Sequence, residues 1–248
     1  MNDIEAERIA VGGLSAFFAR PLGRSRGGML LLPMITGIGA QVREYAEDIA
    51  GAGLTALVWD PFHGASDDDT PREGLVELMN GLDDEACLAE MRTLLDHMFG
   101  ELELESVGVI GWCLGGRYAL ILGSRDNRVA NVVAYHPSIH DPLPPHHTVD
   151  AVDSAARITA PVMVLHAGAD TVMTPDTFGR LQSTLQNRES GATLVHAYPG
   201  AEHGFSVRAR HTNPINAAAY AVSWPQVLAF AAATVGTGDT LGGLRPSG

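Results

Sequence analysis

A cysteine in a glycine-rich segment is the residue of this sequence best placed to do chemistry. Cys113 lies in the run GWCLGG, residues 111–116, between a predicted strand and a predicted helix. Small residues two positions before and after the cysteine allow strand and helix to pass closely at a sharp turn. The turn places the thiol at a helix N-terminus, whose partial positive charge favours the thiolate. The pattern predicts a cysteine nucleophile, with the amide of Leu114 directed at the oxyanion formed by its attack.

The alternative is a packed thiol in a glycine-rich turn, because a lone cysteine is usually buried and inert. The strand–helix context and the partners further along the chain favour a functional Cys113. The second cysteine, Cys87, lies inside a long predicted helix beside Leu88 and Met91. We interpret Cys87 as a core residue.

A thiol nucleophile needs a base, and the base needs an orienting carboxylate. Asp170 follows the predicted strand Pro161–Ala167, and His203 follows the predicted strand Thr193–Tyr198. The chain order of nucleophile, acid and histidine is one that hydrolases use. Both residues come just after parallel strands, at the sheet edge where open α/β sheets place their sites. We therefore predict Cys113, Asp170 and His203 as the catalytic residues.

The other histidines are interpreted from their positions. Two lie within predicted strands and are expected in the core: His166 and His196. Three lie in or beside the proline-rich stretch 137–145 and are expected to be solvated: His140, His146 and His147. His136 ends a strand and is a candidate for lining a pocket. The sequence contains no HExxH motif and no His-x-His pair, so we expect no metal and no cofactor.

Short apolar runs alternate with helix-period segments along the chain. The predicted strands are Met29–Leu32, Thr55–Asp60, Val107–Trp112, Val129–Tyr135, Pro161–Ala167 and Thr193–Tyr198. The predicted helices are Gln41–Ala50, Asp83–Phe99, Leu114–Leu122, Pro175–Arg188 and Ile215–Ala233. This alternation predicts an α/β fold with a mostly parallel central sheet and helices on both faces. Residues 8–21 are expected to form a hairpin that turns at Gly12 and Gly13. We expect one domain over residues 1–235 and a flexible tail over residues 236–248.

Charge and composition exclude several classes of protein. The chain has 248 residues, a net charge of −13 and 16 basic residues, all of them arginine. Without lysine there is no Schiff-base chemistry and no ordinary Walker A site. A chain this acidic is expected to bind nucleic acid poorly, because binding phosphates needs clustered cations. The charged N-terminus is unlike a signal peptide, no apolar run suits a membrane span, and two cysteines fit the cytoplasm, where we expect the protein.

The motifs resemble those of the dienelactone hydrolases, a branch of the α/β-hydrolase superfamily. The resemblance covers about residues 29–230 and rests on GWCLGG, on the GAD run 168–170, on the HGF run 203–205 and on Asp60 with the following Pro-Phe. It implies an α/β-hydrolase fold and a Cys113–His203–Asp170 triad. It also implies an oxyanion hole made by the backbone amides of Leu114 and Ile35.

One position departs from the family pattern. Well-studied members carry a glutamate in the loop after the first central strand, where it interacts with the thiol, and Met34 stands there in this chain. A thioether neither bears charge nor accepts a strong hydrogen bond. Either His203 activates Cys113 alone, or another group takes the glutamate's part.

The family's substrates carry a carboxylate that arginines hold. Arg208, five residues after His203, and Arg72 are the candidates for substrate binding here. The acidic run Asp67–Asp69 would repel an anion if it faced the pocket, and we interpret it as a solvated loop.

The expected function is hydrolysis of a small ester or lactone by a cysteine nucleophile, through a thioester acyl-enzyme. The substrate is then a small molecule, and no nucleic acid or membrane partner is expected. Three alternatives stay open at this point: a broader carboxylesterase or thioesterase acting on neutral esters, a non-catalytic relative that binds a small ligand, and a redox protein that uses Cys113 as a peroxidatic thiol.

Overall fold

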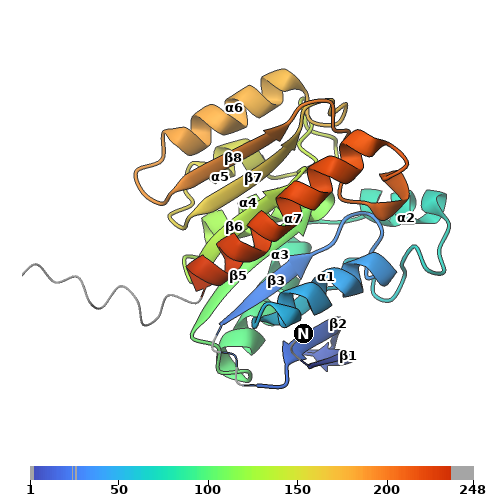
Figure 1. The fold of residues 1–248 in the computed structure, drawn as a ribbon, viewed down its shortest axis with the longest axis vertical. Coiled ribbons are helices and arrows are strands. Elements are labelled where there is room, and N and C mark those ends of the chain that lie inside the picture. The colour runs from blue at the N-terminus through green and yellow to red at the C-terminus, as the bar shows by residue number, and fades with distance from the viewer. Residues whose placement is uncertain (1–2, 24, 26, 236–248) are drawn as a thin grey trace, which may run out of the picture.

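The computed structural model describes residues 3–23, 25 and 27–235, and its strands form one eight-stranded sheet. The order across the sheet is β1-β2-β4-β3-β5-β6-β7-β8 (Figure 1). Neighbouring strands from β4 to β8 run parallel, and β1 and β2 add an antiparallel hairpin at one edge. The strands are β1 (Ile4–Val11), β2 (Leu14–Pro21), β3 (Gly27–Leu32), β4 (Thr55–Trp59), β5 (Ser106–Trp112), β6 (Val129–Tyr135), β7 (Val162–Ala167) and β8 (Thr193–Tyr198).

Helices cover both faces of this sheet. The helices α1 and α7 pack on one face, and α3, α4, α5 and α6 pack on the other (Figure 1). They are α1 (Ala40–Gly51), α2 (Arg72–Asn80), α3 (Asp84–Gly100), α4 (Leu114–Arg125), α5 (Ala151–Ala155), α6 (Pro175–Gln186) and α7 (Pro214–Val235), with one 3-10 turn, η1 (Arg208–Arg210). The predicted α/β fold with helices on both faces is confirmed.

Alternation along the strands creates two apolar cores, one on each face of the sheet. On β3, Leu30 and Leu32 enter the core under α3 and α4, whereas Met29 and Leu31 enter the core under α1 and α7. Successive side chains of a strand point to opposite faces, so a strand covered on both sides must be apolar throughout. All six residues of β3 are buried.

The predicted elements agree closely with the observed ones, and three were missed. The hairpin is confirmed: β1 pairs with β2, and Gly12 and Gly13 turn the chain with φ of 57° and 87°. The missed elements are α2, α5 and η1. The predicted tail, residues 236–248, falls outside the described residues.

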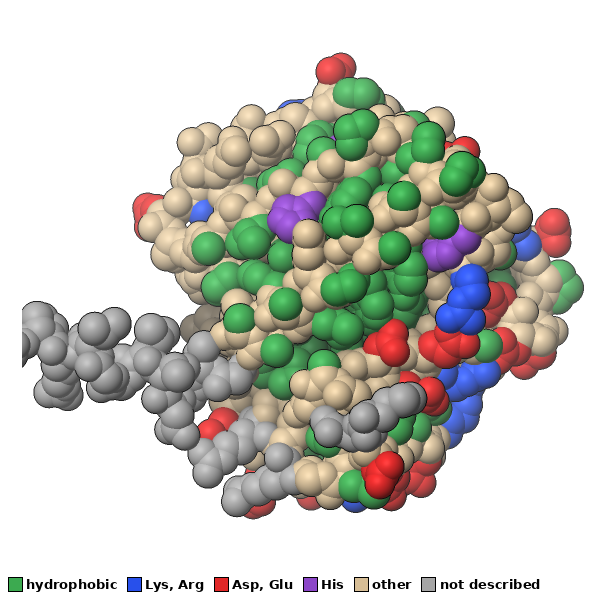
Figure 2. All heavy atoms as spheres, viewed as in Figure 1, with side chains coloured by type: hydrophobic (Ala, Val, Ile, Leu, Met, Phe, Trp, Pro, Cys, Tyr) green, Lys and Arg blue, Asp and Glu red, His purple; other side chains and the backbone are tan. Residues whose placement is uncertain are grey.

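The last helix, α7, is long and apolar enough to cross a membrane by length and composition alone. The expectation that no segment would meet that test is therefore wrong. Figure 2 shows hydrophobic side chains spread over the face of the molecule on which α7 lies. Trp224, Val227 and Ala231 of α7 are buried in the core that it shares with the sheet. The helix therefore packs one side against the sheet, and 39% of its apolar 18-residue window is buried.

The acidic run Asp67–Asp69 is an exposed turn, as expected, and Asp68 accepts a hydrogen bond from the Ala40 amide at 2.9 Å and pairs with Arg43 at 2.8 Å, at the start of α1. Two expectations about the histidines are corrected. His140, His146 and His147 are partly buried rather than solvated, and His196 is partly buried rather than in the core. His166 is buried as expected, stacked on Phe178 with ring centroids 3.6 Å apart.

A buried ion pair joins α3 to α4. Both terminal nitrogens of Arg117 donate to the carboxylate of Asp84 at 2.7 Å, and neither side chain is more than 1% exposed. The Tyr118 hydroxyl and the amides of Thr148 and Val149 donate to the same carboxylate. The network therefore fixes the helix that begins beside Cys113 to α3 and to the loop before α5.

The same network sets the charge state of Asp84. Burial favours the protonated form, but the hydrogen bonds and charge of Arg117 outweigh burial and lower the pKa of Asp84 below its usual value. Because the pKa of Asp84 is lower in the folded than in the unfolded protein, Asp84 stabilises the fold most at pH values where it is ionised in both states. That stabilisation is complete above about pH 4 and is lost as the pH falls through the depressed value.

Arg117→Met should lower the free energy of unfolding by about 3–5 kcal/mol, because it leaves the Asp84 charge buried without its partner. The matched control is Arg125→Met, which removes an exposed pair with Glu85 between the same two helices. That control should cost less than about 1 kcal/mol. Urea denaturation of both variants measures the difference, and equal losses would contradict the structural role of the buried pair.

Candidate active site

Cys113 stands at a strained turn between β5 and α4. Its φ of 52° and ψ of −112° are unusual for a residue with a side chain. A Cβ on Gly111 would lie 2.0 Å from the carbonyl oxygen of Gly115, and a Cβ on Gly115 would lie 1.9 Å from that of Leu32. Glycine is therefore required on both sides of the cysteine, for the close passage that the motif predicted.

Backbone hydrogen bonds fix the turn to its neighbours. The Cys113 amide donates to the Tyr135 carbonyl at 3.1 Å, and the Cys113 carbonyl accepts from the Ser138 amide at 2.9 Å. The Gly115 amide donates to the Pro33 carbonyl at 3.1 Å, which holds the loop after β3 against the start of α4. The two amides predicted to bind an oxyanion thus belong to this loop (Ile35) and to the first residue of α4 (Leu114).

Asp170 and His203 meet where β7 and β8 end. The Nδ1 atom of His203 lies 2.9 Å from Oδ2 of Asp170. The other oxygen of Asp170 accepts from the amides of Val172 and Met173, at 2.7 and 3.1 Å. Burial alone would raise the pKa of Asp170, but the hydrogen bond and charge of His203 lower it. Asp170 is therefore a charged acceptor that fixes the orientation of the His203 ring.

Cys113 and His203 act on each other as a charged pair. Burial would raise the pKa of the Cys113 thiol, but the charge and hydrogen bonding of His203, together with the Leu114 amide, lower it. Burial would lower the pKa of His203, but Cys113 and Asp170 raise it to about 10. Asp170 takes the Nδ1 atom of His203, so Nε2, which has no other partner among the described residues, is the ring nitrogen left for the thiol. The structure thus brings the three predicted catalytic residues together.

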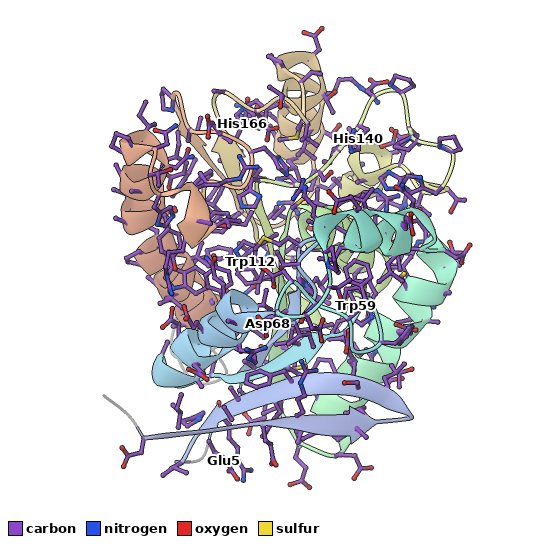
Figure 3. All side chains as sticks on the ribbon, turned by 90° about the vertical axis from the view of Figure 1, so that its right-hand side faces the viewer. Glu5, Trp59, Asp68, Trp112, His140 and His166 are labelled. Atoms are coloured by element: carbon purple, nitrogen blue, oxygen red, sulfur yellow. The ribbon has the colours of Figure 1, made fainter. Side chains whose placement is uncertain are left out.

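The residue before this turn is labelled in Figure 3. Trp112, which precedes Cys113, lies near the middle of the view, with His140 and His166 above it and Asp68 below. Beneath the turn, the ring of Trp112 stacks on that of Tyr45 with centroids 4.7 Å apart. Met34 is buried in the apolar core against which Cys113 packs. The position where the family resemblance implies a carboxylate is therefore apolar.

The two arginines predicted to bind substrate are both exposed on the surface. Arg208 forms an ion pair with Glu44 of α1, and the two side chains are 67% and 43% exposed. Arg72 is the exposed first residue of α2. Within the described residues, neither arginine forms an ion pair or hydrogen bond with Cys113, His203 or Asp170.

Sequence reasoning missed Ser206 and treated His136 only as a possible pocket residue. Both are fully buried, and the Nε2 atom of His136 lies 2.7 Å from the Ser206 hydroxyl. The ring of His136 is 5.2 Å from that of His203. In the sequence Ser206 directly follows the HGF run, but this adjacency gives no sign of its contact with His136.

Comparison with known proteins places this geometry in a family. The family model described as "Dienelactone hydrolase family" matches residues 14–234. The chain belongs to the dienelactone hydrolase family. Members of this family and the relatives described next indicate a hydrolase that acts on lactone or ester bonds.

Three similar proteins illustrate the relationship. A Bradyrhizobium sp protein assigned as a 2-oxo-3-(5-oxofuran-2-ylidene)propanoate lactonase is 26% identical, over 77% of this chain and 78% of its own. The carboxymethylenebutenolidase of Rhodococcus opacus is 25% identical, over 82% of this chain and 79% of its own. A crystal structure from Klebsiella pneumoniae assigned as a dienelactone hydrolase has a TM-score of 0.81 and 20% identity, over 93% of this chain and 99% of its own. The similarity to this crystal structure, at 20% identity, shows the fold alone.

Iodoacetamide should alkylate Cys113 of this dienelactone hydrolase family member at about pH 6.5 roughly tenfold faster than it alkylates an ordinary thiol. The reason is that a lowered thiol pKa keeps thiolate present as the pH falls, until the pH passes through that pKa. Cys87 is the internal control, because burial raises the pKa of its thiol to about 11. Mass spectrometry of the labelled peptides measures both rates, and equal labelling of the two cysteines would contradict the charged pair.

Proposed function

We propose that the protein hydrolyses a small ester or lactone with Cys113 as nucleophile, through a thioester acyl-enzyme. The observation that carries the proposal is that His203 interacts with both the Cys113 thiol and the Asp170 carboxylate, with its Nδ1 atom 2.9 Å from Asp170. A nucleophile, a base and an orienting acid are the groups that acyl transfer needs. The lowered pKa of Cys113 and the raised pKa of His203 support a thiolate beside an imidazolium.

In the first step the Cys113 thiolate attacks the carbonyl carbon and forms a C–S bond. The carbonyl electrons move to oxygen, and the oxyanion is held by the amides of Leu114 and Ile35. Each such donor is worth about 2.7–4 kcal/mol of transition-state stabilisation. When the oxyanion collapses, the C–O bond to the leaving group breaks, and the His203 imidazolium gives its proton to the departing oxygen.

In the second step water hydrolyses the thioester. His203, now neutral, takes a proton from the water as the water attacks the acyl carbon. The C–S bond breaks, the acid product leaves, and Cys113 returns as a thiolate beside protonated His203. Asp170 keeps the Nδ1 proton on His203 throughout, so that Nε2 always faces the reacting atoms.

The names of the relatives support a lactone substrate. The Bradyrhizobium and Rhodococcus proteins are named for reactions on unsaturated lactones that carry a carboxylate. Arg208 and Arg72 are the side chains proposed to hold such a carboxylate.

A neutral ester is the second candidate substrate, and two observations favour it. The guanidinium of Arg208 is already neutralised by Glu44 on α1. The apolar Met34, buried in the core against which Cys113 packs, also adds no charge to the site. An uncharged acyl group would need no free cation.

Cys113→Ala should reduce hydrolysis of every ester and lactone substrate by at least about a thousandfold, because the covalent intermediate can no longer form. The variant should fold normally, since the change removes only one sulfur atom at a partly exposed position. Turnover of a neutral aryl acetate and of a lactone carboxylate measures the loss. Cys87→Ala is the control and should keep full activity on both. Activity surviving in Cys113→Ala would refute the proposed nucleophile.

Arg208→Ala separates the two substrate classes. If the pair with Glu44 occupies Arg208, kcat/KM should change less than about threefold on either substrate, as expected for an exposed ion pair. Steady-state kinetics on the same aryl acetate and lactone carboxylate provide the measurement. A loss of about tenfold or more that is confined to the anionic substrate would instead assign Arg208 to carboxylate binding.

A further inference from the structure

His136 is a buried histidine that directly follows β6, and the mechanism above gives it no part. Its side chain is fully buried, and its φ of 36° lies in the left-handed region that few residues other than glycine adopt. The His136 amide donates to the Leu165 carbonyl at 2.8 Å. One residue earlier, the carbonyl of Tyr135 accepts from the Cys113 amide. The backbone at His136 is therefore fixed to β7, and the residue before it is fixed to Cys113.

The His203 turn, residues 203–207, is held through Ser206. The Ser206 hydroxyl lies 2.7 Å from Nε2 of His136. The Ser206 carbonyl accepts hydrogen bonds from the Tyr45 hydroxyl at 2.8 Å and from the Gln41 side chain at 2.7 Å, both on α1. The turn that carries His203 is thus attached to β6 by one bond and to α1 by two.

The two histidine rings also touch directly. Their centroids are 5.2 Å apart and their planes meet at 64°, an edge-to-face contact. Asp170 holds the Nδ1 end of the His203 ring, and His136 lies against the ring itself. The two contacts together limit how far Nε2 of His203 can move relative to the thiol.

We propose that His136 is a positioning residue for His203. Through Ser206 and through ring contact it holds the His203 turn at the distance from Cys113 that the charged pair requires. This inference rests on the proposed function, because it takes His203 as the base. In this role His136 neither contacts substrate nor transfers a proton.

The charged groups around His136 are consistent with this part. His203 lies beside it on the turn after β8, Arg210 on η1 adds positive charge, and Tyr135 precedes it on β6. Burial, and then the charges of His203 and Arg210, lower the pKa of His136 well below its usual value. A neutral ring can pack against an imidazolium, whereas a second cation 5.2 Å away would oppose protonation of His203.

The test compares variants on the two sides of the hydrogen bond. Ser206→Ala removes the bond and leaves the backbone at His136 unchanged, and His136→Phe removes both the bond and the histidine. The probe is iodoacetamide labelling of Cys113 as a function of pH, measured beside the kcat and KM for an aryl acetate. In both variants the midpoint of labelling should rise by about one pH unit, with a roughly tenfold fall in labelling rate below the midpoint. The fall should appear in kcat rather than in KM.

Two further variants serve as controls. His136→Gln places an amide about where Nε2 lies and should recover much of the lost labelling. His166→Phe changes another buried histidine, on the neighbouring strand β7, and should leave the midpoint unchanged. Thermal melting checks folding, and Ser206→Ala carries the test if His136→Phe is unstable because of its positive φ.

Labelling midpoints of Ser206→Ala and His136→Phe that equal the midpoint of the unchanged protein would overturn the positioning role. That result would leave the proposed function intact. The proposed function fails by a different result, namely activity that survives in Cys113→Ala.

Discussion

The first turn of α4 packs very closely against the ends of β3 and β5, and this packing determines the rest of the site. The carbonyl oxygen of Leu32 occupies the space that a side chain on Gly115 would need. The chain can therefore turn from β5 into α4 only with Cys113 at a positive φ, a conformation that costs about 1–3 kcal/mol. The same contact presses the loop after β3 against α4. It thereby brings the loop that carries Ile35 next to the start of α4, where Leu114 lies.

Such a strained turn persists only if the helix behind it cannot move. The pair of Asp84 and Arg117 supplies that rigidity, because it fixes α4 one turn after the cysteine. The planar guanidinium matches both carboxylate oxygens at once, a geometry that a lysine ammonium does not offer. On the other side, the His203 turn is held by α1 through Tyr45 and Gln41. The proposed nucleophile and base are therefore positioned by different helices on opposite faces of the sheet.

Much of the fold could be predicted because strands buried on both faces leave a strong apolar signal. That Cys113, Asp170 and His203 meet at one edge of the sheet could also be predicted, since each follows a strand. The short helix α2 was missed because Leu75 is its only buried residue, which gives almost no periodicity. Contacts that join distant segments leave no local pattern. The bond of Ser206 to His136 spans 70 positions, and the pair of Arg208 with Glu44 spans 164.

The separation of the two apolar cores has a consequence for oxidation of the protein. Cys87 belongs to the core under α3 and α4, whereas Cys113 packs against the core under α1 and α7. The sheet lies between the two thiols, so they cannot join in a disulfide while the fold is intact. A sulfenic acid formed on Cys113 would have no resolving thiol within its own chain. Its reduction would depend on a small thiol from solution.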